Sequence, residues 1–76
     1  MNKRRREKIS KAVNYLRTAR DLVDTVMSEE QDAFDSTPES IQDSEKGEKM
    51  EEAIGNLDDA IDNIDTAIES LEEAAN

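Results

Sequence analysis

A seven-residue repeat in the second half of the chain constrains the fold most strongly. Large apolar residues recur there at alternating gaps of four and three residues, which places them along one face of an α-helix. The series consists of Met50, Ile54, Leu57, Ile61, Ile64, Ile68 and Leu71. A narrow apolar face of this kind, here called the seam, is stable only when another helix covers it. The repeat therefore predicts long helices packed side by side.

The first half of the chain carries a weaker form of the same pattern. Ile9, Leu16 and Val23 are spaced by seven residues, and a neighbouring stripe contains Ala12, Ala19, Val26 and Ala33. This periodicity predicts a helix over about residues 3–34. The residues expected to cover the second helix are Ile9, Val13, Leu16, Val23, Val26 and Phe34.

Between the two repeats lies a short polar segment with the only proline, Pro38. Ser36 or Thr37 is expected to cap a short helical turn over about residues 38–43, and Ser36 with Glu39 fits a capping box. A second bend is expected at Asp43 or Ser44, followed by a helix over about residues 45–75. The predicted helices are about 48 and 46 Å long, so they match as an antiparallel pair. We therefore predict an all-α fold, a single antiparallel two-helix hairpin over residues 1–76.

The charge distribution supports this arrangement. Residues 1–27 hold eight basic and three acidic side chains, a balance of +5, whereas residues 28–76 hold two basic and seventeen acidic ones, a balance of −15. In an antiparallel hairpin the basic start at Lys3–Lys8 would lie beside the acidic end at Glu69, Glu72 and Glu73. Basic residues at the start of a helix and acidic residues at its end are each unfavourable with the helix dipole. Placed side by side, the two groups would offset each other.

A row of alanines beside the seam suggests a second contact. Ala53, Ala60, Ala67 and Ala74 recur every seven residues and would let a further helix approach closely. A chain of 76 residues without cysteine has neither a large core nor disulfides to stabilise it. We therefore expect a homodimer in which two hairpins form a four-helix bundle, and a monomeric hairpin is the alternative.

The composition argues against an enzyme. Because the chain has no cysteine and no histidine, thiolate and imidazole chemistry are excluded. Asp58, Asp59, Asp62 and Asp65 lie within two helical turns, but the Glu-x-x-His pattern of helical di-metal sites and the calcium-loop spacing are both missing. We expect no catalytic residue, no metal and no cofactor.

Two charged surfaces are candidates for partner binding. The basic residues Lys3, Arg4, Arg5, Arg6 and Lys8 could follow a phosphate backbone, but no aromatic residue is interleaved with them, and pairing with the acidic end accounts for them equally well. The acidic candidates are Asp58, Asp59, Asp62, Asp65, Glu69, Glu72 and Glu73. Their rows of carboxylates along a rod could compete for a basic channel built for nucleic acid, or could serve solubility alone.

The central stretch Glu29–Gln42, continued by Ser44-Glu45-Lys46 and Met50-Glu51-Glu52-Ala53, resembles small acidic helical proteins encoded by phages and prophages. Gly47 departs from that pattern, in which a bulkier residue is expected. The resemblance implies a phage origin and a place in the cytoplasm of a bacterial host cell. No apolar run is long enough to span a membrane, and no secretory signal follows the basic start.

Three functional hypotheses follow. The first is a non-enzymatic interaction module that binds a host protein, such as a defence or nucleic-acid enzyme, through its acidic face. The second is a small assembly protein whose role is dimerisation itself. The third is a nucleic-acid accessory protein that acts through its basic N-terminal residues.

Overall fold

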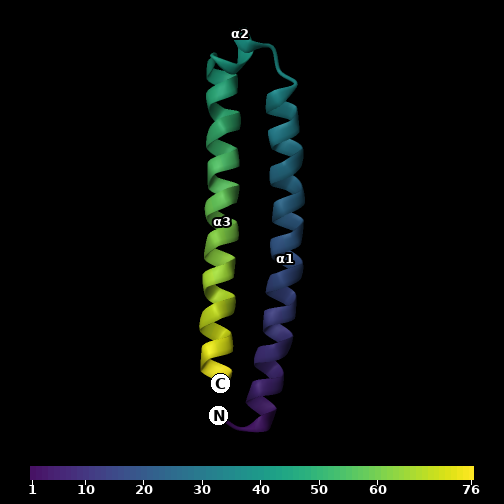
Figure 1. Ribbon diagram of the computed structural model, residues 1–76, viewed down its shortest axis with the longest axis vertical. Helices are drawn as coiled ribbons and strands as arrows, with labels where there is room; N and C mark the ends of the chain where they lie inside the picture. The colour runs from purple at the N-terminus through teal and green to yellow at the C-terminus, as the bar shows by residue number, and fades with distance from the viewer.

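The computed structural model describes residues 1–76 and is a rod-shaped helical hairpin (Figure 1). Helix α1 spans Lys3–Asp35, the short helix α2 spans Glu39–Gln42, and helix α3 spans Glu45–Ala75. The molecule measures 58 × 15 × 12 Å, and both termini lie at the end opposite α2. The predicted all-α hairpin is confirmed, with bounds within about one residue of those expected for the two long helices. No helix is both long and apolar enough to cross a membrane.

Helix α1 begins with a side-chain cap that the sequence reasoning did not anticipate. The Oδ1 atom of Asn2 accepts a hydrogen bond from the backbone N–H of Arg5 at 2.8 Å. Asparagine is among the best residues at this position because its side chain satisfies one of the free N–H groups of the first turn. The cap is needed because the first turn holds no acidic residue to complement the helix dipole.

The predicted capping box at the start of α2 is wrong. Ser36 has helical backbone angles and its N–H donates to the carbonyl of Asp32, so it belongs to the last turn of α1. The Thr37 hydroxyl also donates backwards, to the carbonyl of Ala33 at 2.7 Å. The residue that precedes α2 is Pro38, which provides no side-chain cap. Both hydroxyl residues thus end α1, and neither begins α2.

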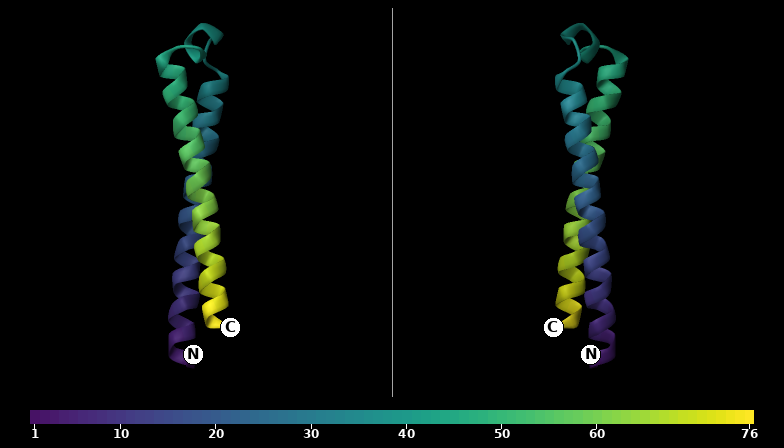
Figure 2. Two further views of the ribbon diagram at one scale, coloured as in Figure 1. Left: turned by 90° about the vertical axis from the view of Figure 1, so that its left-hand side faces the viewer. Right: turned by 90° about the vertical axis from the view of Figure 1, so that its right-hand side faces the viewer.

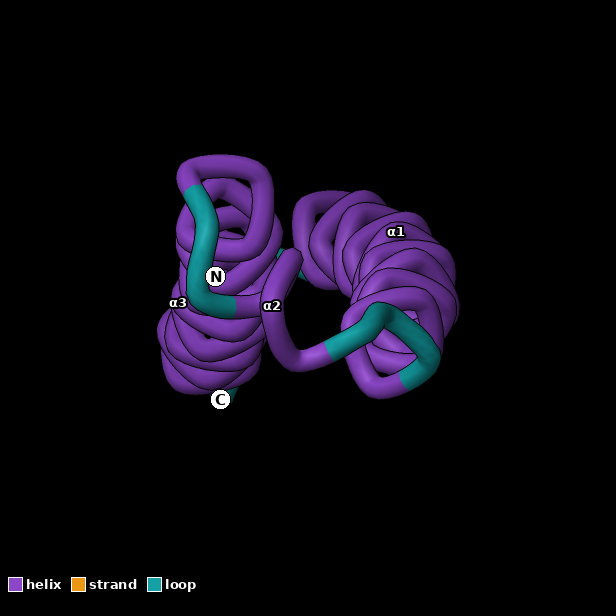
Figure 3. The backbone as a smooth tube through the Cα atoms, turned by 90° about the horizontal axis from the view of Figure 1, so that it is seen from above, coloured by secondary structure: helices purple, strands orange, loops and turns teal.

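Helix α2 lies across the end of the rod and links the two long helices (Figure 3). The Gln42 side-chain amide donates to the carbonyl of Phe34 at 2.8 Å, which ties α2 to the last turn of α1. The Ser44 hydroxyl donates to the carbonyl of Ile41. Gly47 is buried beneath this bend, and a Cβ atom built on it would lie 2.0 Å from the carbonyl oxygen of Gln42. The bulkier residue expected at position 47 would therefore have no room.

The two long helices stay side by side along the rod and cross at a shallow angle (Figures 1 and 2). Val13 and Ile68 are the most buried apolar side chains, each only 5% exposed. The remaining seam residues of α3 are partly buried, and they are Met50, Ile54, Leu57, Ile61, Ile64 and Leu71. The core is therefore a single line of contacts between two helices.

One residue predicted for this line is misplaced. Val26 is 50% exposed, and the partly buried residue at that level is its neighbour Met27. The residues of α1 that face α3 are Ile9, Val13, Leu16, Arg20, Val23, Met27, Glu30 and Phe34, which keep the alternating gaps of four and three. This face was favoured because it brings the large side chains of Met27 and Phe34 against α3. The stripe that contains Val26 lies to one side of it.

Candidate functional site

One side of the hairpin joins the two helices by ion pairs, and we call it the pairing side. Arg17 Nη2 lies 3.4 Å from Glu72 Oε1, and Arg20 Nη1 lies 2.7 Å from Asp65 Oδ1. The hydrogen bond and the negative charge of Asp65 raise the pKa of the Arg20 guanidinium above its ordinary value. Arg17, Asp65 and Glu72 each directly follow a seam residue that stands before a gap of four residues, so this position in the repeat defines the pairing side.

The ion pairs divide the seven acidic residues predicted to bind a partner. Asp65 and Glu72 are engaged by arginines of α1 and belong to the pairing side. Asp58 has the same repeat position as these two but forms no ion pair. The other four, which we call the acidic face, are exposed and form no ion pair: Asp59, Asp62, Glu69 and Glu73. They occupy the outward surface of α3, where successive turns are about 5.4 Å apart. Such a row is suited to contact with several cations on one opposing surface.

The predicted pairing of the basic start with the acidic end is not formed. Lys3, Arg4, Arg5, Arg6 and Lys8 are all exposed and none of them takes part in an ion pair. The reason is the register of the hairpin. Because Arg20 pairs with Asp65, the last residue of α3 lies near the level of Ser10, ten residues away on each helix. Figure 1 shows the N-terminal end of α1 projecting past the C-terminus. We call residues 3–8 the basic overhang.

The side opposite the pairing side is apolar and open to solvent. On α1, Tyr15 and Leu22 are each 65% exposed and Val26 is 50% exposed. On α3 the alanines 53, 60, 67 and 74 directly precede seam positions, as Val26 does on α1. Residues that precede the seam on two antiparallel helices fall on the same side, so these side chains share one surface. We call this surface the apolar side.

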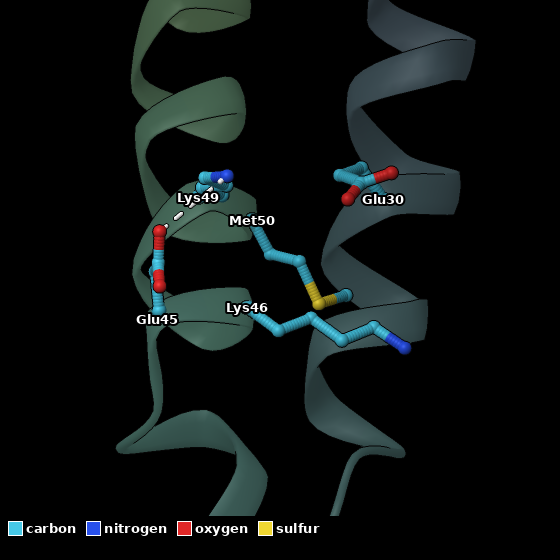
Figure 4. A pocket seen from close by; sticks show the side chains of 5 residues that line it. All are labelled: Glu30, Glu45, Lys46, Lys49 and Met50. Atoms are coloured by element: carbon cyan, nitrogen blue, oxygen red, sulfur yellow. Dashed lines mark ion pairs between the residues drawn. The ribbon is translucent and has the colours of Figure 1, made fainter.

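A small notch near the bend holds the only two basic residues of α3 (Figure 4). Lys49 Nζ lies 3.6 Å from Glu45 Oε1, one helical turn earlier. Lys46 makes no ion pair, and its side chain reaches toward α1, as does that of Met50. The notch is open and exposed, and nothing in its lining suggests a bound ligand.

The sequence reasoning missed the exposed apolar residues of α1 and the arginine within the helix interface. A signal for the first was present, because Tyr15 and Leu22 are seven residues apart, as are Ala19 and Val26. Arg20 could have been found from its place in the series of alternating gaps that runs through Leu16 and Val23.

No group of three or more Asp or Glu residues is close enough to hold a metal ion. The chain matches no protein-family model, no curated protein and no solved structure.

Proposed function

We propose that this protein is a non-enzymatic interaction module that pairs with a second copy through its apolar side and offers its acidic face to a basic partner protein. The observation that carries the proposal is the separation of the two surfaces. Leu22 and Tyr15 are exposed on the apolar side, which also carries the row of alanines of α3, whereas the free carboxylates lie on the outward surface of α3. A helical rod with one apolar side and one charged face suits assembly on the first and recognition on the second.

Self-association is supported by the energetics of the exposed apolar residues. Full burial of a side chain such as Leu or Val contributes about 1.5–3 kcal/mol. The hairpin leaves Leu22 and Val26 largely in water, while only Val13 and Ile68 are well buried within it. A second hairpin laid on the apolar side would cover these residues in both copies and complete a four-helix bundle.

Recognition of a basic partner is supported by the carboxylates that the hairpin leaves free. Opposite charge on a facing protein surface speeds association and suppresses wrong partners. The resemblance to small phage proteins suggests that the partner is a host protein in the bacterial cytoplasm, and that the module inhibits a defence or nucleic-acid enzyme by occupying its basic channel. The origin and the target are parts of the proposal.

Self-association is tested by sedimentation equilibrium of the wild-type chain and of Leu22→Glu. Glutamate is a good helix former, so the hairpin should stay folded while the apolar side becomes charged. We expect a wild-type dimer and a Leu22→Glu monomer with unchanged helicity by circular dichroism. Thr18→Glu, an exposed position off the apolar side, is the matched control and should remain dimeric. A wild-type chain that is monomeric at high concentration would overturn this part of the proposal.

Partner binding is tested by affinity capture from a bacterial lysate with Asp59→Lys/Asp62→Lys. This double substitution reverses two charges of the acidic face, so the variant should no longer capture the protein that the wild-type chain captures. Thr18→Lys/Thr25→Lys is the control, because both residues are exposed on the outward surface of α1 and lie away from the bend. If the reversal on α3 captures the same protein as the wild-type chain, the acidic face is not the binding surface.

The second candidate is an assembly protein in which dimerisation is the whole role. It is favoured by the exposed apolar side alone and needs no function for the acidic face. In that case the Leu22→Glu variant would fail to replace the wild-type chain in the cell, while the Asp59→Lys/Asp62→Lys variant would replace it.

A further inference from the structure

We infer that the second copy lies on the apolar side in the antiparallel direction, so that the basic overhang of each protomer meets the acidic bend end of the other. The bend end is defined as residues 28–52, which include α2. This inference rests on the self-association proposed above and adds the direction and the charged contacts of the dimer.

The cationic groups of the basic overhang are available to a second protomer, because they form no ion pair within the hairpin. Residues 3–8 project beyond the level at which α3 ends, and none of their cationic groups forms an ion pair. Five of the chain's ten basic residues are gathered in this one stretch.

The bend end has the opposite charge, and most of its carboxylates form no ion pair. Residues 28–52 contain ten acidic and two basic side chains, a balance of −8. The only ion pair there is the exposed one between Lys49 and Glu45. One end of the rod therefore has a balance of −8, whereas the other end, residues 1–13 together with residues 69–76, has a balance of +2.

These two ends decide between the possible dimers. Most homodimers have two-fold symmetry, so two hairpins on one another's apolar side run either in the same direction or in opposite directions. Packed helices are about 8–10 Å apart, close to the screening length at physiological salt, so charges on neighbouring helices still act on each other. The parallel dimer would place two bend ends of −8 together. The antiparallel dimer places each bend end beside a basic overhang.

The position of the apolar residues fits the antiparallel dimer. Leu22 lies near the middle of α1, which spans Lys3–Asp35, and therefore near the middle of the rod. A two-fold axis through the middle would bring Leu22 beside its own copy. Arg4 lies eighteen residues, about 27 Å, before Leu22 along α1, whereas α1 ends thirteen residues, about 20 Å, after Leu22 and α2 lies across the rod beyond that end. The overhang of one protomer therefore reaches the level of Glu39 and Asp43 in the other.

Spin-label distances test the direction directly. The chain has no cysteine, so Ser40→Cys introduces a single labelling site at an exposed position of the bend. In the antiparallel dimer the two labels should be separated by roughly the 58 Å length of the rod. In the parallel dimer they would lie within about 20 Å, two helix spacings apart. Asn14→Cys, on α1 away from the bend, is a control for label behaviour in the same dimer.

A charge swap tests the contacts. Arg4→Glu/Arg5→Glu should weaken the dimer about tenfold by sedimentation equilibrium, the equivalent of about 1.4 kcal/mol. Adding Glu39→Lys/Asp43→Lys to the same chain should restore wild-type association, because each protomer then presents the reversed pair to the other. Helicity by circular dichroism confirms that each variant is folded.

The outcomes separate this inference from the proposal on which it depends. A wild-type monomer would overturn both. A dimer with a short Ser40 label distance, or with no restoration by the charge swap, would overturn the antiparallel arrangement and leave self-association intact. A long label distance together with restored association supports the inference.

Discussion

Arg20, which lies in the α3-facing series of α1, donates a hydrogen bond to Asp65 of α3 at 2.7 Å, and this pair sets the register of the hairpin. The Arg20 side chain is 36% exposed, so its stem packs between the helices while its charged end reaches solvent. A single polar residue in an otherwise apolar seam specifies one register and one partner orientation at some expense of stability. The unpaired overhang of residues 3–8 is a direct result of the register that this pair selects.

Arg20→Leu is expected to raise the thermal unfolding midpoint and to lower structural uniqueness. Leucine would complete the apolar line next to Val23. It could not form the bond to Asp65 that holds the two helices in one register. Thermal circular dichroism measures the first effect, and extra or broadened amide peaks in NMR spectra measure the second. A lower midpoint with sharp spectra would show that the ion pair contributes more than an apolar contact.

The Arg20–Asp65 pair should also be insensitive to alkaline pH over the practical range. The bond to Asp65 raises the pKa of the guanidinium above its ordinary value, so the cation is present at every lower pH. A group whose pKa is raised by folding adds stability that is lost only as the pH rises through that raised value. The difference in unfolding midpoint between wild type and Arg20→Leu should therefore be the same at pH 7 and pH 9. A difference that changes over this interval would contradict the assignment.

Gly55→Ala should stabilise the protein by about 1 kcal/mol, the difference between glycine and alanine within a helix. Gly55 is exposed in α3, and an added Cβ atom would meet nothing within 4 Å. The substitution therefore gains helix propensity without a clash. Urea unfolding followed by circular dichroism measures the gain, and an unchanged or lower midpoint would indicate that this position has a packing role.

Gly47→Ala is the counterpart and should destabilise the protein by about 1–3 kcal/mol. Its Cβ atom would overlap the backbone of Gln42, which cannot move without shifting α2. We expect faster amide exchange in residues 39–47 and loss of the Gln42 hydrogen bond to Phe34. Because both glycines are helical and receive the same methyl group, Gly55→Ala is the control that separates propensity from packing.

Asn2→Ala should destabilise the start of α1 by about 1 kcal/mol, through loss of the hydrogen bond to Arg5. Asn2→Asp should restore the cap and add a favourable charge at the positive end of the helix dipole. Amide exchange of the first turn is the sensitive measurement, since residues 3–6 are all exposed. If Asn2→Ala leaves that exchange unchanged, Asn2 does not cap the helix in solution.

The strong repeat of α3 was enough to predict the hairpin, because isoleucines and leucines occur there on only one face. The contact face of α1 could not be read in the same way. Residues 26 and 27 are both apolar, and both fit a seven-residue repeat, so periodicity alone does not say which of them meets α3. That choice depends on which face carries the larger side chains, which is a property of the packed pair.

The candidate surfaces were predictable in composition but not in arrangement. The acidic residues of α3 were correctly grouped on a helix, yet which of them remain free depends on the reach of Arg17 and Arg20 from the other helix. The close approach of Gln42 to Gly47 arises from the path of the chain through the bend, and a sequence pattern does not encode such a distance.

The projection of α1 past α3 has a consequence for proteolysis. Helical backbone that packs against no neighbour opens readily, and enzymes that cut after lysine or arginine need such locally opened segments. Five of their recognition residues lie between positions 3 and 8, and Ile9 is the first residue of α1 that is partly buried. Cleavage after Lys8 would remove all five of these cations, half of the chain's ten, and would leave the paired stretch of the two helices intact. Limited digestion would therefore change the charge of this end of the rod without unfolding it.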